Sequence, residues 1–249
     1  MITGQGAVIG ERVRPGVELV TLNRPERLNA IDVSLLDGLY AALARIAHDE
    51  TCAVVVLTGA GRGFCAGLDL KGIGPSPVSA GLEGPAAGMR GQAYFGEAPA
   101  TIRRLPQPVI AAVNGPAYGG GLALANACDV RIAAESARFG TQAIRVGMSG
   151  GEMGTTYVLP RLVGAARAHE LILTARDFHP DEAERIGLLA GVVPDGQVVG
   201  AALDLAGSMA ARGRAALVRA KHLLRAGVDT PDLATALSTA LTGAPAPGG

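Results

Sequence analysis

Two glycine-rich stretches, each after an apolar run, are the first candidates for chemistry. Pro108–Val113 leads to the triplet Gly119–Gly121, which opens an Ala/Leu-rich segment. Val54–Thr58 leads to a second glycine-rich stretch, residues 59–67. A glycine turn at a helix start leaves unpaired amides beside the positive end of the helix dipole, and the missing Cβ lets a ligand come close. Such turns suit a phosphate or a developing oxyanion.

The spacing separates these two chemistries. Gly119–Gly121 fits neither the dinucleotide pattern Gly-x-Gly-x-x-Gly nor the phosphate-loop pattern Gly-x4-Gly-Lys-Ser/Thr, and no Lys or Arg follows within the turn. Two loops at the ends of adjacent strands can each offer one amide to a single oxygen, which is the geometry of an oxyanion hole. The alternative is a tight turn that binds no ligand.

A third glycine-rich loop, Gly147–Gly154, contains one carboxylate, Glu152. A carboxylate in an apolar, glycine-rich pocket is expected to have a raised proton affinity, which suits a general acid or base. The alternative is that Glu152 caps a helix beginning near Gly154, because acidic residues are common in a first helical turn.

Alternating strand and helix patterns must position these loops. Residues 7–14 and 17–22 predict a hairpin, and Asp32 or Ser34 can cap a helix that runs to about His48. The segment Gly72–Gly91 is dense in glycine and proline, and we expect a lid or insert there. Further strands are expected at 53–58, 108–113, 130–133 and 188–193. Further helices are expected at 92–104, 154–162, 165–173, 180–186, 198–212, 213–226 and 232–241.

Composition excludes several classes of protein. The net charge is +0, from 22 basic and 22 acidic residues, and aromatic residues are only 3%, which argues against a nucleic-acid partner. No apolar stretch is long enough for a transmembrane helix and no signal-like leader is present, so we expect a cytoplasmic protein without a membrane partner. Three scattered cysteines indicate reduced thiols. The scattered histidines show no ligand spacing, and we expect no metal and no cofactor.

Three motifs together resemble the crotonase (enoyl-CoA hydratase/isomerase) superfamily. They are Asn23–Ala30, Phe64–Leu70, and Asn114–Gly121 followed by Cys128 and Asp129, and they occur in the family's order and spacing. The resemblance implies an α/β fold in which a spiral of ββα units forms residues 1–194. It also implies that residues 195–249 form a helical trimerisation region, in a homotrimer or a dimer of trimers.

The resemblance also implies site residues for an acyl-CoA thioester, in which coenzyme A belongs to the substrate. The amides of Leu68 and Gly120 would hold the thioester oxygen as an enolate forms. The remaining implied coenzyme A contacts are Arg27, Leu28, Ala30, Ala66, Asp69, Leu70 and Lys71. Among these, Arg27 and Lys71 carry the positive charge suited to coenzyme A phosphates.

Two positions depart from the family pattern. Family hydratases activate water with two glutamates, and the matching positions here are Ala123 and Ala143. Glu152 is then the only acid/base, and one carboxylate can move a proton between two carbons, which is double-bond isomerisation. Two alternatives stay open: a hydratase with a single carboxylate, and an acyl-CoA-binding protein that catalyses nothing.

Overall fold

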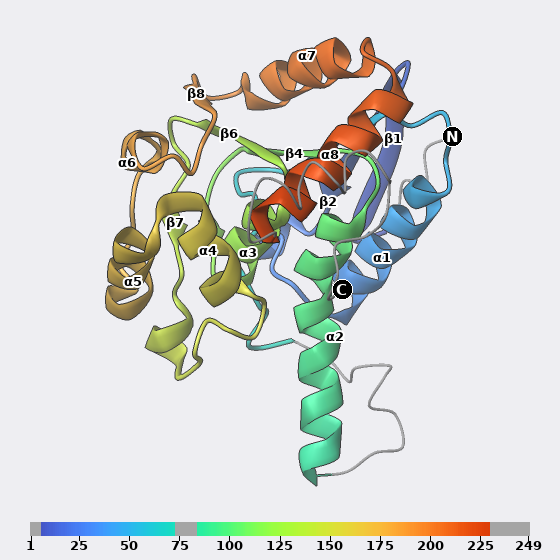
Figure 1. The fold of residues 1–249 in the computed structure, drawn as a ribbon. Helices are drawn as coiled ribbons and strands as arrows, with labels where there is room; N and C mark the ends of the chain where they lie inside the picture. Colours follow the sequence, from blue (N-terminus) through green and yellow to red (C-terminus); the bar gives the residue numbers. More distant parts are fainter. Residues whose placement is uncertain (1–5, 73–83, 230–249) are drawn as a thin grey trace.

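A mixed six-stranded sheet, with strand order β1-β2-β3-β4-β6-β8, forms the centre of the fold (Figure 1). The structure is a computed structural model that describes residues 6–72 and 84–229. Only β1 runs antiparallel to its neighbour, and the other pairs in this sheet are parallel. The strands of this sheet are β1 Val8–Arg14, β2 Val17–Leu22, β3 Val54–Gly59, β4 Val109–Val113, β6 Val130–Ala134 and β8 Gly191–Val193.

The central parallel strands are continuous apolar runs because the sheet is covered on both faces. Every residue of β3 and of β4 is buried, as expected for strands that pack helices on each side. A small second sheet pairs β5 (Ala117–Tyr118) with β7 (Phe139–Gly140). It continues from the end of β4 and so lies beside the glycine triplet.

Helices flank the sheet and follow its strands. The α-helices are α1 Val33–Ala47, α2 Gly84–Arg104, α3 Gly120–Ala127, α4 Thr155–Val163, α5 Ala165–Thr174, α6 Pro180–Arg185, α7 Val198–Ala210 and α8 Arg214–Asp229. Short 3₁₀ helices are η1 Pro25–Arg27 and η3 Ala143–Val146. Helix α1 begins as predicted, because the Asp32 carboxylate accepts a hydrogen bond from the Leu35 amide at 2.8 Å.

Two apolar layers hold the helices to the sheet. On one face, α1, α2 and α3 pack in the larger core, where Leu36, Phe64 and Ile102 are fully buried. On the other face, α7 packs Ala202 and Ala206 against Val56 and Ile110. The predicted helical region therefore shares a core with the sheet, and the proposed division at residue 194 stays a prediction.

Most predicted elements are confirmed to within a few residues, with corrections at two places. Residues 84–91 belong to α2 and are not an irregular lid, because Pro85 lies in the first helical turn, where the missing N–H has no helical acceptor to lose. The strand predicted at 188–193 shortens to β8. The rest of the expected lid, residues 73–83, and the expected helix 232–241 lie outside the described residues. No helix within the described ranges is long and apolar enough to cross a membrane.

Candidate active site

Two asparagines, the buried Asn29 and the half-buried Asn114, fix the loop that follows β3. The Asn29 amide group donates hydrogen bonds to the carbonyls of Ala60, at 3.0 Å, and Gly63, at 2.8 Å, and its oxygen accepts from the Arg24 amide. Asn29 is fully buried and sits at φ 56°, a left-handed conformation that asparagine tolerates better than most residues. The Asn29 side chain therefore supplies hydrogen bonds to a loop that is not paired with a neighbouring strand.

Asn114 performs the same task from the end of β4. Its nitrogen donates to the carbonyls of Gly59, at 2.9 Å, and Gly61, at 3.0 Å, and its oxygen accepts from the Gly59 amide at 3.2 Å. The loops after β3 and β4 are thus joined to each other by side-chain hydrogen bonds. This arrangement brings the two predicted glycine stretches together.

Glycine at two positions lets these loops touch. A Cβ on Gly121 would overlap the carbonyl oxygen of Cys65. Gly67 has φ +95°, and its Cβ would lie 2.9 Å from the Tyr118 oxygen and 3.4 Å from the Gly120 nitrogen. Residues 68 and 120, which come from loops far apart in sequence, are therefore near neighbours.

The amides of Leu68 and Gly120 are both available to a ligand. Leu68 forms a single parallel bridge with Ile31, in which the Ile31 amide bonds to the Gly67 carbonyl at 2.7 Å and the Asp69 amide to the Ile31 carbonyl at 2.9 Å. Because successive strand residues point their amides to opposite sides, the Leu68 amide faces away from Ile31. Gly120 opens α3, so its amide has no acceptor in the helix. Across residues 6–72 and 84–229, neither amide donates a hydrogen bond.

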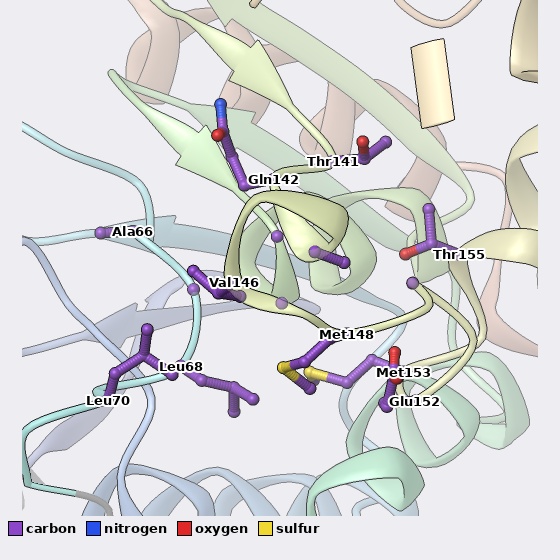
Figure 2. A pocket seen from close by; sticks show the side chains of 15 residues that line it. Ala66, Leu68, Leu70, Thr141, Gln142, Val146, Met148, Glu152, Met153 and Thr155 are labelled. Carbon is purple, nitrogen blue, oxygen red and sulfur yellow. The ribbon is translucent and has the colours of Figure 1, made fainter. Parts of the chain in front are cut away.

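Leu68, Gly120 and Glu152 line one cavity of about 190 Å³ (Figure 2). Leu68 approaches from one side and Glu152 lies across the cavity, with Met148 and Met153 between them (Figure 2). Most of the side chains that line the cavity are aliphatic or thioether groups. Ala66, Leu70 and Ala143 also line this cavity.

Hydrogen bonds, and not burial, decide the acidity of Glu152. Burial would raise the pKa of this carboxyl, but hydrogen bonding to the Ser149 amide and hydroxyl and to the Glu152 and Gly150 amides together outweighs that effect, and the pKa is lowered. The raised proton affinity predicted from sequence is therefore wrong, because the glycine turn supplies its own donors. The capping alternative is also not observed, since the cap of α4 is Gly154 and no side chain bonds there.

Asp69 is part of an ion-pair cluster beside the site. It is 4% exposed and pairs with Arg27 at 2.7 Å and with Arg24 at 3.2 Å. The Arg27 hydrogen bond is the main reason that the pKa of Asp69 falls to about 2. Arg27 and Asp69 therefore bind each other, whereas Lys71 is exposed.

Three other positions that the sequence singled out, Leu28, Ala30 and Ala123, are not among the residues that line the cavity. The Leu28 carbonyl accepts from the Ala66 amide at 2.9 Å, so the segment holding Leu28 and Ala30 is attached to the loop that leads to Leu68. Ala123 is buried inside α3. Neither alanine at the family's glutamate positions, Ala123 or Ala143, offers an acid/base group.

Several cavity residues were not predicted. Met148 and Met153 line the cavity, and a Cβ on Gly120 would lie 2.7 Å from the Met153 sulfur. Thr141 and Thr155 also line the cavity. The sequence signal for the methionines was their place within the third glycine loop, beside Glu152. Among the described residues no group of three or more His, Cys, Asp or Glu side chains has the geometry of a metal site.

Comparisons with known proteins agree with this fold and cavity. Residues 12–242 match the family model described as Enoyl-CoA hydratase/isomerase. The probable enoyl-CoA hydratase echA12 of Mycobacterium bovis is 44% identical over 226 residues, which is 91% of this chain and 79% of that protein.

Solved structures agree as well. A probable enoyl-CoA hydratase/isomerase from Mycobacterium abscessus superposes with a TM-score of 0.89 at 39% identity, covering 96% of this chain and 89% of that one. A monofunctional enoyl CoA isomerase from M. smegmatis gives a TM-score of 0.77 at 41% identity, with 94% and 99% covered. The chain belongs to the enoyl-CoA hydratase/isomerase family, the crotonase superfamily, and is a probable enzyme of fatty acid metabolism.

Proposed function

We propose that this enzyme moves a double bond within the acyl group of an acyl-CoA thioester. Leu68 and Gly120 would hold the thioester oxygen through their amides, and Glu152 would carry the proton. The observation that supports this most directly is that Leu68, Gly120 and Glu152 line one cavity, while Ala123 and Ala143 supply no second acid/base group.

The proposed reaction balances without water or a cofactor. The Glu152 carboxylate removes a proton from one carbon of the enoyl group, and the electron pair moves to the thioester oxygen as an enolate. The enolate collapses as the protonated Glu152 returns the proton to a different carbon. Each oxyanion donor contributes about 3–4 kcal/mol in comparable sites. The Glu152 carboxyl is ionised at neutral pH, which is the form in which a base must start, and its lowered pKa makes it a weak base that depends on the enolate being stabilised by the two amides.

Coenzyme A would bind along the segments next to this cavity. Lys71 is exposed and suits a phosphate, while Arg27 would have to share its guanidinium with Asp69. Leu28, Ala30, Ala66 and Leu70 would contact the rest of the thiol arm. We propose a cytoplasmic homotrimer or dimer of trimers, and sedimentation analysis of the purified protein tests that assembly.

Hydration is the second candidate, because echA12 is named a probable hydratase. In that reaction Glu152 alone would activate the water. Water would add across the double bond, so the product would be heavier than the substrate by one water molecule. A chromatographic and mass-spectrometric assay with 2-enoyl- and 3-enoyl-CoA thioesters separates the two reactions, since isomerisation leaves the mass unchanged.

Glu152→Gln tests the proton carrier. Loss of general acid/base catalysis typically lowers kcat by about 10²–10⁴-fold. Binding of a saturated acyl-CoA, measured by calorimetry, should be retained. The matched control is Glu135→Gln, because Glu135 is an exposed carboxylate outside the cavity. Wild-type turnover by Glu152→Gln would reject Glu152, and an enzyme that binds acyl-CoA but converts none of the thioesters would be a binding protein.

A further inference from the structure

Helix α2 reaches the Glu152 loop at Gly96, at a distance that only glycine permits. A Cβ on Gly96 would lie 2.5 Å from the backbone carbonyl oxygen of Glu152. Real Cβ atoms do not approach another atom this closely, and the atom in question belongs to the backbone and not to a flexible side-chain end. Glycine inside a helix lowers helix stability, so this position needs a packing or functional reason.

Helix α2 is fixed on its other side and cannot easily yield. The Tyr40 hydroxyl of α1 donates to the Tyr94 carbonyl of α2 at 2.5 Å, and the Tyr94 hydroxyl donates to Asp37 of α1. The neighbours of Gly96 on the inner face, Phe95 and Ala98, are buried in the main core. The position of this helical turn is therefore set by α1 and the core.

The loop that contains Glu152, Gly147–Gly154, can move more easily than α2. Gly147, Gly150 and Gly154 all have positive φ values, and a Cβ on Gly147 or Gly154 would meet nothing within 4 Å. Within the loop, the Ser149 amide and hydroxyl bond to Glu152, and the Gly154 amide bonds to the Gly151 carbonyl. A group added at position 96 would therefore displace Glu152 before it displaced α2.

We infer that Gly96 is a positioning residue, which sets the place of the Glu152 carboxylate over the cavity through the Glu152 backbone. This inference rests on the proposed role of Glu152 as proton carrier. Gly96 itself lies outside the cavity wall and would touch no reacting atom. Through Gly96, the packing of α2 against α1 would affect where the Glu152 carboxylate lies.

Gly96→Ala tests the inference. We expect kcat to fall by about tenfold or more, because small displacements of a catalytic group have effects of that size. KM and the binding of a saturated acyl-CoA should stay within about twofold of wild type. The acidic limb of the kcat/KM profile should move to higher pH as the Ser149 hydrogen bonds to Glu152 loosen. The matched control is Gly200→Ala in α7, whose Cβ would meet nothing within 4 Å.

A second variant separates positioning from general damage. Tyr40→Phe removes one hydrogen bond that fixes α2, so Tyr40→Phe/Gly96→Ala should recover part of the lost kcat. If Gly96→Ala alone does not fold, the double variant is compared with Tyr40→Phe. A kcat of the double variant below that of Tyr40→Phe supports the inference, and equal kcat values overturn it. A folded Gly96→Ala variant that has the kcat and the pH profile of the wild type also overturns the inference. If Glu152→Gln is fully active, the proposed function fails instead, so the two failures are distinguishable.

Discussion

Ser149 donates two hydrogen bonds to the same oxygen of Glu152, from its amide at 2.7 Å and from its hydroxyl at 2.9 Å. Burial alone would raise the pKa of Glu152, but both bonds stabilise the charged carboxylate and, together with the Glu152 and Gly150 amides, lower that pKa. The turn from 149 to 152 therefore favours the ionised form of this carboxyl, whereas an apolar pocket alone would favour the neutral form.

Ser149→Ala should move the acidic limb of the kcat/KM profile to higher pH. One donor to the ionised form is lost, so the pKa of Glu152 rises and the base becomes protonated at a higher pH than in the wild type. A pH–rate series on the substrate that turns over checks this shift. Ser208→Ala is the control, because that hydroxyl bonds only within α7. An unmoved acidic limb would show that Glu152 is not the group that titrates.

The sequence predicted the parts of this site that depend on local pattern. Continuous apolar runs followed by glycine indicated β3 and β4, and two exposed amides after them indicated where an oxygen could bind. The two strands are confirmed, because burial on both faces of a parallel sheet imposes long apolar runs. The roles of the two amides stay predictions, as does that of Glu152, which was singled out as the one acid in the loop 147–154.

The remaining features depend on tertiary contacts that one sequence does not display. Nothing in the pattern shows that Gly96 meets the Glu152 backbone, or that Ser149 reverses the expected pKa shift. Arg27 was expected to face a phosphate, but its partner in the structure is Asp69, 42 residues away in sequence. The helical residues 84–91 were missed because glycine and proline weaken helix periodicity there.

Asn114→Ala should loosen the loop after β3, within residues 59–67. The change removes the side-chain partners of the Gly59 amide and of two loop carbonyls. Leaving such groups unpaired costs about 1–3 kcal/mol, so urea denaturation should show a loss of about 2 kcal/mol in the free energy of unfolding. We also expect a lower kcat/KM, because this loop leads to Leu68.

The matched control for Asn114 is Asn23→Ala, which removes one exposed side-chain hydrogen bond to the Gly6 carbonyl. A loss well under 1 kcal/mol is expected there, as for most surface substitutions. Equal losses in the two variants would mean that Asn114 does not hold the loop through its side chain.

Asp69→Asn should remove a stability contribution that depends on pH. The folded pKa of Asp69, about 2, lies below the unfolded value near 3.9, so its contribution is complete above the unfolded pKa and is lost as the pH falls through about 2. Arg27 is partly exposed and solvent screens the pair, so we expect about 1–2 kcal/mol at neutral pH. Urea denaturation of both proteins from pH 7 to pH 2 should show the difference shrinking below about pH 4. A difference that does not change with pH would contradict the ion-pair explanation.

Asp129→Asn should release α8 from the sheet. Asp129 follows α3 and pairs with two residues of α8, Lys221 at 2.8 Å and Arg225 at 2.7 Å. The Lys221 ammonium is 6% exposed and also donates to the Gln107 carbonyl, so the neutral variant leaves a buried charge without its counter-charge. Breaking such a pair costs about 3–5 kcal/mol, which favours withdrawal of the helix into water.

Hydrogen–deuterium exchange read by mass spectrometry should then show faster exchange across α8 in Asp129→Asn, with β3 and β4 unchanged. Asp204→Asn is the control, because its pair with Arg14 is mostly exposed and contributes little. Wild-type protection of α8 in Asp129→Asn would mean that apolar packing holds this helix without the ion pairs. Faster exchange confined to α8 would show that one carboxylate after the glycine-turn helix fixes the C-terminal helix to the central sheet.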